Sequence, residues 1–468
     1  MKKGGLAELF KPIDMTEGSP VKKIAAFAFP MLLGNIAQQL YNTVDSIVVG
    51  RYVGDNALAA VGNAGPIFNL LLVLFVGVST GATILVSQYV GARDREGLSK
   101  SIGASILLTI VTSLFIMILG PLIARPILRL LNTPESIMDW CASYLTIMFL
   151  GLMGLSFYNM LTGILRGLGD SLSALLYLLI ATGLNIVLDI VFVRYFHMEV
   201  AGVALATIIA QFVSAVLCFI KLSKMQQYFD LKLKYFRFSK KYTLDIVKLG
   251  LPSGLSQAIF SVAMVVVQRL TNSFGETIIA ANVIVMRIDG FAMMPNFSFS
   301  GAMTTYAGQN LGARKLDRIE KGTRQGMLLT TGVATVLVAI IVLFGRHLMG
   351  IFTETEELVT ISNRFMRILA VGYILMGFSQ VYQGVMRGVG DTMTPMWISL
   401  LTTVVIRVPL AYLLAFLTKS AEYPNGRFEI LPISLLAAWV IGAILSFVFY
   451  KAGKWKKQFD GVHPLKEE

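Results

Sequence analysis

Two short sequence motifs each occur twice in this chain, and the spacing between the two copies is the same for both motifs. Gly-Ile-Leu-Arg-Gly-Leu-Gly-Asp at residues 163–170 returns as Gly-Val-Met-Arg-Gly-Val-Gly-Asp at residues 384–391. Ser-Gln-Tyr-Val-Gly-Ala-Arg at 87–93 returns as Gly-Gln-Asn-Leu-Gly-Ala-Arg at 308–314, and both pairs are offset by 221 residues. A shared offset at two separate motifs indicates a duplicated unit. Because the copies lie among long apolar runs, that unit is predicted to be a membrane bundle.

The composition supports a membrane protein. Hydrophobic residues make up 55% of the chain and charged residues only 14%, and the mean hydropathy is +0.71. About 20 apolar residues span the bilayer core as a helix, which predicts an all-α membrane protein with twelve transmembrane helices in two pseudo-symmetric six-helix lobes. The predicted spans are 24–48, 58–86, 102–124, 138–162, 171–193, 201–222, 244–270, 278–305, 325–345, 358–383, 393–417 and 431–450. Two homologous membrane halves are typical of a transporter that rocks around a central site.

The net charge of +13 reflects membrane topology rather than nucleic-acid binding. With the N-terminus inside, Lys and Arg gather in the inner loops, as around Arg93, Lys221–Lys248 and Arg314. This positive-inside pattern predicts a multi-pass protein of the inner (cytoplasmic) cell membrane with both termini in the cytoplasm. The first apolar run is too long for a cleaved signal peptide.

The same pattern predicts the domain organisation. The expected segments are a cytoplasmic N-terminal segment (1–23), an N-lobe (24–222), a cytoplasmic linker (223–243), a C-lobe (244–450) and a cytoplasmic tail (451–468). The linker sequence 232–237 is basic and partly amphipathic, so it is predicted to lie on the inner membrane surface or, alternatively, to be a solvated connection. Cys141 and Cys218 fall at opposite ends of their spans, and no disulfide is expected.

A few polar and ionisable residues within the N-lobe spans indicate the chemistry. Asp45 and Asp189 precede the outer-loop residues Arg51 and Arg194 by six and five positions, which places both acids within about 10 Å of the outer boundary. Three further polar residues lie at a similar depth, and one of them stands four residues before Asp189 on the same helix face: Asn185, Tyr144 and Thr207. Acids inside spans usually face a wet cavity or a partner.

Two carboxylates, an amide, a phenol and a hydroxyl in one low-dielectric pocket would make a cation site. Close carboxylates resist both being charged, so the pair would hold one proton. Alternatively, Asp45, Asn185, Asp189 and Thr207 would ligate a sodium ion. The simpler alternative for Asn185, Thr207 and Tyr144 is that they only hydrogen-bond one helix to another.

The second half lacks this acidic cluster. The 221-residue offset places Leu410 opposite Asp189. Instead, Arg287, Asp289 and Arg407 lie well inside apolar runs. They would line a substrate cavity or form an ion pair that locks the lobe. Met286 and Met293 on the same predicted helix would form a soft surface for varied apolar ligands, or would simply pack or face lipid.

The repeated motifs are interpreted as structural. Gly91 and Gly312 are predicted to stop their helices in a left-handed conformation, and Asp170 and Asp391 to cap the helices that follow. Pro30 is different, because proline inside a span frees a carbonyl and permits bending. We expect this bending, beside Asp45, to couple cation binding to cavity shape.

Taken together, these features resemble the multidrug and toxic compound extrusion (MATE) transporters over nearly the whole chain. Besides the paired motifs, the resemblance is carried by Pro30 fifteen residues before Asp45, by Asn185-x-x-x-Asp189, and by the run 202–207. It implies two six-helix lobes and export of amphipathic, often cationic compounds against an inward flow of cations. It further implies the branch whose cation site lies in the N-lobe, with coupling positions that map onto Asp45, Tyr144, Asn185, Asp189 and Thr207. The span-7 acid of another branch has no match here.

The same residues allow two other functions to be considered for this chain. An intramembrane enzyme using the two aspartates is disfavoured, because no third catalytic group, metal-ligand spacing or phosphate-binding loop accompanies them. A flippase for lipid-linked precursors, from the same superfamily, would more often show several cavity arginines, and Arg287 and Arg407 leave that alternative open. We therefore expect a monomeric antiporter, with no cofactor, H⁺ or Na⁺ as coupling ion, and small amphipathic or cationic substrates in a lipid environment.

Overall fold

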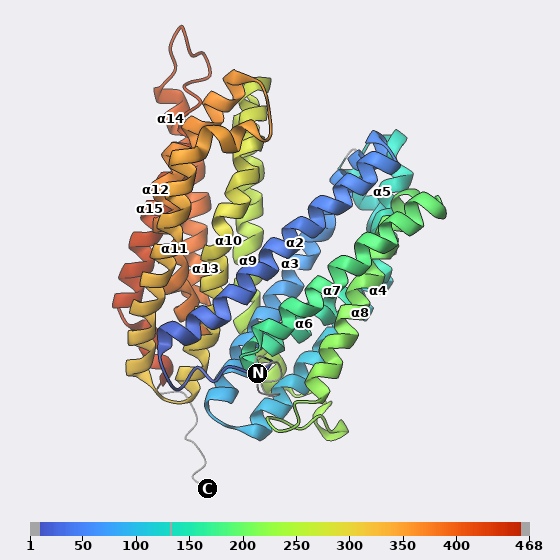
Figure 1. Ribbon diagram of the computed structural model, residues 1–468, viewed down its shortest axis with the longest axis vertical. Helices are drawn as coiled ribbons and strands as arrows, with labels where there is room; N and C mark the ends of the chain where they lie inside the picture. The colour runs from blue at the N-terminus through green and yellow to red at the C-terminus, as the bar shows by residue number, and fades with distance from the viewer. Residues whose placement is uncertain (1–9, 132, 460–468) are drawn as a thin grey trace, which may run out of the picture. The chain divides into compact units, whose positions relative to one another are not determined.

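The computed structural model describes residues 10–131 and 133–459, which are almost entirely helical (Figure 1). The first half contains α2 (Pro20–Tyr52), α3 (Asp55–Gly91), α4 (Arg95–Leu130), α5 (Glu135–Leu150), α6 (Leu152–Leu168), α7 (Ser171–Ile190) and α8 (Glu199–Ser223). The second half contains α9 (Lys240–Asn272), α10 (Glu276–Gly312), α11 (Leu316–Gly350), α12 (Glu356–Gly388), α13 (Met393–Leu400), α14 (Val408–Leu417) and α15 (Ile430–Lys451).

Most of these helices are long and apolar enough to cross a membrane. Among the described residues, nine meet that criterion alone, and the bent pair α5–α6 makes a tenth. The span predicted at 138–162 is therefore not one continuous helix: it breaks at Gly151 with a bend of 52°. A Cβ at Gly151 would lie 2.2 Å from the Ile208 side chain, so the break falls where α8 packs against this glycine.

The described residues form two compact units, each a bundle of helices. Unit 1 holds the described residues up to Asp14 together with Phe29–Gly254, and unit 2 holds Met15–Ala28 together with those from Leu255 onward. Helices α2 and α9 each pass from one unit to the other, and Pro30 and Pro252 lie two residues from the two changes of unit.

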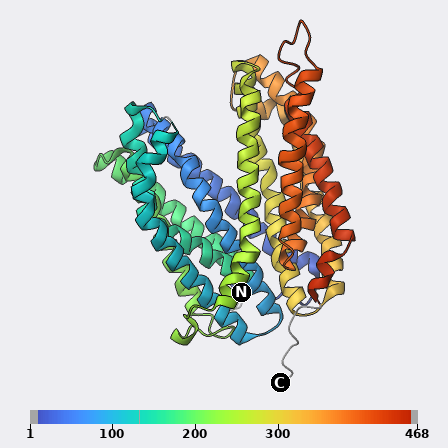
Figure 2. The same cartoon turned by 180° about the vertical axis from the view of Figure 1, so that it is seen from behind.

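The repeat seen in the sequence reappears as matched hydrogen bonds inside the two units. Ser79 of α3 donates to the backbone carbonyl of Asn159 in α6 at 2.6 Å, and Ser300 of α10 donates to that of Gln380 in α12 at 2.8 Å. Two further bonds of unit 1 have counterparts 221 residues later in unit 2. The Thr83–Gly163 bond matches Thr304–Gly384, and the Cys141–Ala60 bond matches Ser362–Ala281. In unit 2, α12 packs against both α10 and α15, and the red helix at the edge of this unit in Figure 2 is α15. The repeat thus fixes how the central helices of each unit pack.

The motif repeated at 87–93 and 308–314 ends its helix in a way that the sequence did not predict. The left-handed residues are Arg93 and Arg314, with φ of 53° and 56°, and not Gly91 and Gly312, which remain helical. The Asp94 N–H donates to the Tyr89 carbonyl at 3.1 Å. This bond spans six residues and pairs a free carbonyl at the end of the helix. The left-handed residue therefore falls two positions later than expected.

The motif repeated at 163–170 and 384–391 caps helices as predicted. Oδ1 of Asp170 accepts from the Ser173 N–H at 2.9 Å at the start of α7. Oδ1 of Asp391 accepts from the Thr394 N–H at 3.1 Å. These carboxylates satisfy free backbone donors and meet the positive end of the helix dipole.

The connection between the halves is docked on unit 1 rather than fully solvated. Arg95 at the start of α4 donates to the backbone carbonyls of Gln226 and Gln227 and pairs with Asp230 at 2.9 Å. The guanidinium group holds the pKa of Asp230 below its usual value. Phe229 is fully buried, so an apolar side chain as well as the charged contacts holds the linker in place.

Candidate functional site in the first unit

The polar residues predicted from depth alone are brought together by four helices of unit 1. Asp45 comes from α2, Tyr144 from α5, Asn185 and Asp189 from α7, and Thr207 from α8. Asn185 and Asp189 are both fully buried. The i, i+4 spacing of these two residues puts them on one face of α7, and helix order then brings that face to Asp45.

Asn185 links the two acids. With its amide nitrogen toward the carboxylates, Nδ2 donates to Oδ1 of Asp45 at 2.8 Å and to Oδ2 of Asp189 at 3.3 Å. The opposite orientation would leave the amide oxygen facing only acceptors, so the hydrogen-bonding pattern determines the assignment.

The two carboxyl groups also approach each other within hydrogen-bonding reach. Oδ1 of Asp189 is buried and accepts from no N–H or hydroxyl donor of the described residues. Two ionised carboxylates cannot donate to each other, and a buried acceptor without a donor is costly. The pair therefore requires a shared proton or a small cation.

Aromatic and hydroxyl groups complete the surroundings. Tyr144 interacts electrostatically with both acids. Tyr41 lies one turn before Asp45 on α2, is only 4% exposed, and lies close to Thr207. Sequence reasoning missed Tyr41, although a phenol four residues from an intramembrane acid shares its helix face.

In unit 2, Asp289 and Arg407 border a second feature, a small cavity of about 70 Å³. Met286 and Met293 also line it, whereas Arg287 does not and its side chain is exposed. The walls come from α9, α10, α12 and α15, with Arg407 at the end of a π-helical turn, Leu401–Arg407, between α13 and α14.

Asp289 and Arg407 form no direct ion pair in this cavity. The Tyr373 hydroxyl donates to Oδ1 of Asp289 at 2.8 Å, while Nη1 of Arg407 contacts the Met264 sulfur at 3.5 Å. Nε of Arg407 is buried with no acceptor among the described residues. The arrangement is that of two charged groups bordering one space, and not of a closed salt bridge that locks the lobe.

Comparison with known proteins decides the family. Residues 30–191 and 252–413 each match the family model described as MatE, so the two blocks follow the repeat and cover most of the chain. The chain belongs to the MatE family. The predicted fold class, two six-helix lobes of an all-α membrane protein, is thereby confirmed, and the intramembrane-enzyme alternative is removed because members of this family are transporters.

Individual relatives agree with this placement in the MatE family. The chain is 28% identical over 446 residues to the probable multidrug resistance protein YoeA of Bacillus subtilis, covering 93% of this chain and 94% of the relative. It is 23% identical over 377 residues to the multidrug export protein MepA of Staphylococcus aureus, covering 80% and 83%. Among solved structures, an outward-facing multidrug resistance MATE transporter matches with a TM-score of 0.88 at 27% identity, covering 96% and 99% of the two chains. A MATE protein in a bent conformation also gives 0.88 at 27% identity, covering 95% and 98%.

Proposed function

We propose that this MatE transporter is a cation-coupled antiporter that exports amphipathic, often cationic compounds by alternating access. The observation that carries the proposal is the pair formed by half-buried Asp45 and fully buried Asp189, joined through Asn185. Such a pair exchanges a cation at low cost, because binding relieves the repulsion between the carboxylates.

The proton is the better candidate for the coupling ion. Asn185 offers its NH₂ group to the acids, which suits carboxylates that share a proton. A sodium ion held by Asp45, Asn185, Asp189 and Thr207 would need the amide turned over so that its oxygen faces the ion. The experiment below must therefore distinguish proton coupling from sodium coupling.

The proposed cycle follows from the positions of the two acids on different helices. Cation binding from outside would let α2 and α7 close together, which narrows the space in the first lobe and expels substrate. Pro30 lies inside α2, fifteen residues before Asp45, and is the proposed point of bending. Cation binding and substrate binding then exclude each other, and thermodynamic linkage makes that effect reciprocal.

Besides the space in the first lobe, the cavity of unit 2 is proposed as a second place where substrate contacts the protein. Asp289 suits a cationic or donor group and Arg407 an anionic or acceptor group, while Met286 and Met293 adapt to varied apolar surfaces. Arg407 is the only arginine of the two predicted candidates that lines the cavity. A pyrophosphate-linked lipid would call for more positive charge, so drug export is favoured over flipping of a lipid-linked precursor.

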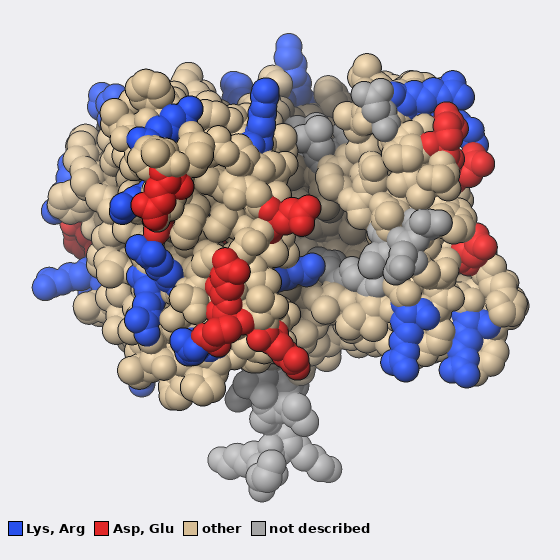
Figure 3. Space-filling model, turned by 90° about the horizontal axis from the view of Figure 1, so that it is seen from above, with Lys and Arg blue, Asp and Glu red and all other residues tan. Residues whose placement is uncertain are grey.

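The proposed setting is the inner cell membrane, with both termini in the cytoplasm, a monomeric protein and no cofactor. The N-lobe branch of the family and the five domain segments remain part of this proposal. On the face seen in Figure 3, acidic and basic side chains are interspersed. This mixture is consistent with an outer face under the positive-inside rule.

The test is transport of ethidium, a fluorescent organic cation, into inverted membrane vesicles under a proton gradient or a sodium gradient imposed separately. We expect the proton gradient to drive uptake in the unaltered protein, and Asp45→Asn and Asp189→Asn each to abolish it at normal abundance. Asp139→Asn, an exposed acid paired with Arg125, is the matched control. Full uptake by both variants would place coupling elsewhere, with Asp289 as the next candidate, and uptake driven by sodium alone would refute the proton assignment.

A further inference from the structure

A buried apolar layer packs beside the acid pair of unit 1. Its buried members touch one another in a single cluster: Val48, Val49, Ala57, Val193, Val200 and Val203. Each of the five valines is 5% exposed or less. Trp140 and Tyr144 of α5 pack against the cluster. We refer to these buried residues as the valine layer.

The valine layer is built on the same helices as the cation site, one turn away. Each of four elements places a layer or packing residue four positions from a site residue. The pairs are Asp45 with Val49 on α2, Asp189 with Val193 on α7 and the π-helical turn Val191–Tyr195 that continues it, Tyr144 with Trp140 on α5, and Thr207 with Val203 on α8. A four-residue step stays on one helix face and advances by about one turn, ~5.4 Å.

All four steps lead toward the same side. The layer residue follows the site residue in α2 and in the continuation of α7, and the packing or layer residue precedes it in α5 and α8. These two pairs of helices run in opposite directions in the predicted topology. The valine layer therefore lies between the acid pair and the predicted outer-loop residues Arg51 and Arg194.

Two polar contacts join these elements beyond the layer. Nε1 of Trp140 donates to Oε2 of Glu199 at 2.8 Å, which ties α5 to the start of α8. The Arg194 guanidinium lies 6.0 Å from the centre of the Tyr52 ring, which ties the end of the π-helical turn to the end of α2. The four elements are thus held in pairs at the edge of the valine layer.

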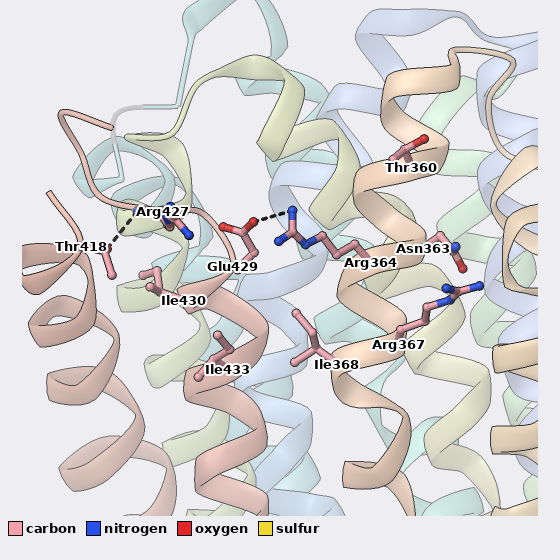
Figure 4. Close-up of a pocket in the computed structure, with 10 residues that line it drawn as sticks. All are labelled: Thr360, Asn363, Arg364, Arg367, Ile368, Thr418, Arg427, Glu429, Ile430 and Ile433. Atoms are coloured by element: carbon pink, nitrogen blue, oxygen red, sulfur yellow. Dashed lines mark hydrogen bonds and ion pairs between the residues drawn. The ribbon is translucent and has the colours of Figure 1, made fainter. Parts of the chain in front are cut away.

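A similar tie in unit 2 indicates that the tie itself does not form the barrier. Glu429, just before α15, pairs with Nη1 of Arg364 on α12 at 2.8 Å (Figure 4). Both residues line a cleft of about 650 Å³. A tie between these helices therefore coexists with a cleft in unit 2. In unit 1 we assign the barrier to the packed valines rather than to the bond between Trp140 and Glu199.

The exposed part of the acid pair lies away from the valine layer. Asn185 and Asp189 are fully buried, whereas Asp45 is half-buried. An ionisable side chain within a membrane span usually faces water or a partner rather than lipid. A cation crossing packed valines would lose its water without gaining other ligands. The side chain of Asp45 is therefore the accessible end of the pair.

We propose that the valine layer seals the acid pair from the outer medium, so that the coupling cation enters and leaves only past Asp45. This inference rests on the proposed coupling function. A direct route through the layer, open while Asp45 is reached from the inside, would connect the two sides of the membrane and dissipate the gradient. Entry past Asp45 also takes the cation through the space of the first lobe from which substrate is expelled, which gives their mutual exclusion a structural reason.

The test is proton entry into proteoliposomes that hold the full-length protein and a pH-sensitive dye, under an imposed membrane potential and without ethidium. Val49→Ser/Val203→Ser makes the layer both roomier and polar, as a water molecule requires. We expect proton entry at least about tenfold faster than with the unaltered protein, because a wet path removes the cost of crossing an apolar layer. Adding Asp189→Asn to this variant should return the rate to that of the unaltered protein.

Two further variants separate a seal from a general packing effect. Val49→Ala/Val203→Ala leaves space that stays apolar and therefore dry, and it should conduct protons less than the serine variant. Val187→Ser/Val216→Ser changes exposed valines of α7 and α8 and should conduct no faster than the unaltered protein. Thermal unfolding midpoints check folding, and Val203→Ser alone serves as a milder form with a smaller increase.

Proton entry that is equal in the folded serine variants and the unaltered protein would overturn the seal. So would an equal increase in the Val187/Val216 control, or a leak that persists when Asp189→Asn is added. Proton-driven ethidium uptake is measured in the same preparations. If the unaltered protein shows driven uptake and a serine variant shows no leak, the seal is rejected and the coupling proposal stands. Absence of driven uptake in the unaltered protein would instead reject the coupling proposal itself.

Discussion

Two acids inside one apolar bundle repel each other unless something lies between them. In this protein Asn185 donates to both Asp45 and Asp189, while Oδ1 of Asp189 still has no donor among the described N–H and hydroxyl groups. Under the proposed function, the site would alternate between an empty state held by the amide and a loaded state held by a cation. This alternation is what a coupling site requires, since the ion must bind and leave in each cycle.

Replacing Asn185 should uncouple transport from the cation gradient while both carboxyl groups of the site remain. Asn185→Ala removes two hydrogen bonds to charged groups, each worth about 1.5–3 kcal/mol. We expect proton-driven ethidium uptake to fall at least about tenfold, while ethidium exchange at equal ion concentrations is retained. Thr182→Ala on the same helix, which loses only a bond to the Leu178 carbonyl, is the control. Unchanged driven uptake in the Asn185 variant would show that the amide is only structural.

At this scale, the sequence predicted which polar residues would meet, because depth and helix order are readable from spacing. It did not predict Tyr41, whose contact with Thr207 depends on how α2 and α8 approach. It also assigned the left-handed stop to Gly91 rather than Arg93. Glycine is the usual choice for that conformation, but the stop position is set by which carbonyl the returning N–H reaches.

At the scale of elements, close helix contacts depend on glycine. A Cβ at Gly81 of α3 would lie 2.2 Å from the Ile246 carbonyl oxygen of α9. Gly81→Ala should therefore lower stability by about 1–3 kcal/mol, as overpacking does. Gly65→Ala in the same helix meets nothing within 4 Å and should be neutral or stabilising. Thermal unfolding in detergent compares the two, and equal midpoints would contradict the contact.

Helix α2 is the element in which bending is expected to matter. Pro30 lies two residues after the change of unit at Ala28, and proline cannot donate the hydrogen bond that would stiffen the helix there. Pro30→Ala should leave folding intact and reduce proton-driven ethidium uptake severalfold. Pro252→Ala, at the matching place in α9, provides the comparison. Unaltered uptake by the Pro30 variant would remove the main support for a hinge in α2.

The sequence predicted a helix well where the length of its apolar run determines it. It predicted poorly the breaks and turns that depend on contacts with neighbouring helices. The break at Gly151 was missed because an apolar window does not show where another helix crosses. The π-helical turn that ends at Arg407 was likewise invisible, although it sets where that guanidinium enters the cavity. Both features arise from tertiary packing and not from local composition.

At the scale of the whole molecule, the duplicated halves have diverged in their buried polar residues. The first unit keeps the acid pair, and the second keeps the cavity with Asp289 and Arg407. If that cavity contacts substrate, Arg407→Gln should change which compounds are exported and leave proton coupling in place. We expect the uptake of a zwitterionic compound to fall more than that of ethidium, when both are measured in the same vesicles. An equal fall for both compounds would indicate a structural role for Arg407.

The central claim is that cation binding at the acid pair and substrate binding exclude each other. The most direct measurement is the equilibrium affinity of the purified protein for ethidium, by fluorescence anisotropy, at low and high concentrations of protons and separately of sodium. We predict that saturation with protons weakens ethidium binding by at least about fivefold, and that this dependence disappears in Asp45→Asn and in Asp189→Asn while Asp139→Asn keeps it. An ethidium affinity that ignores both cations in the unaltered protein, or a proton dependence that survives in both variants, would contradict the account.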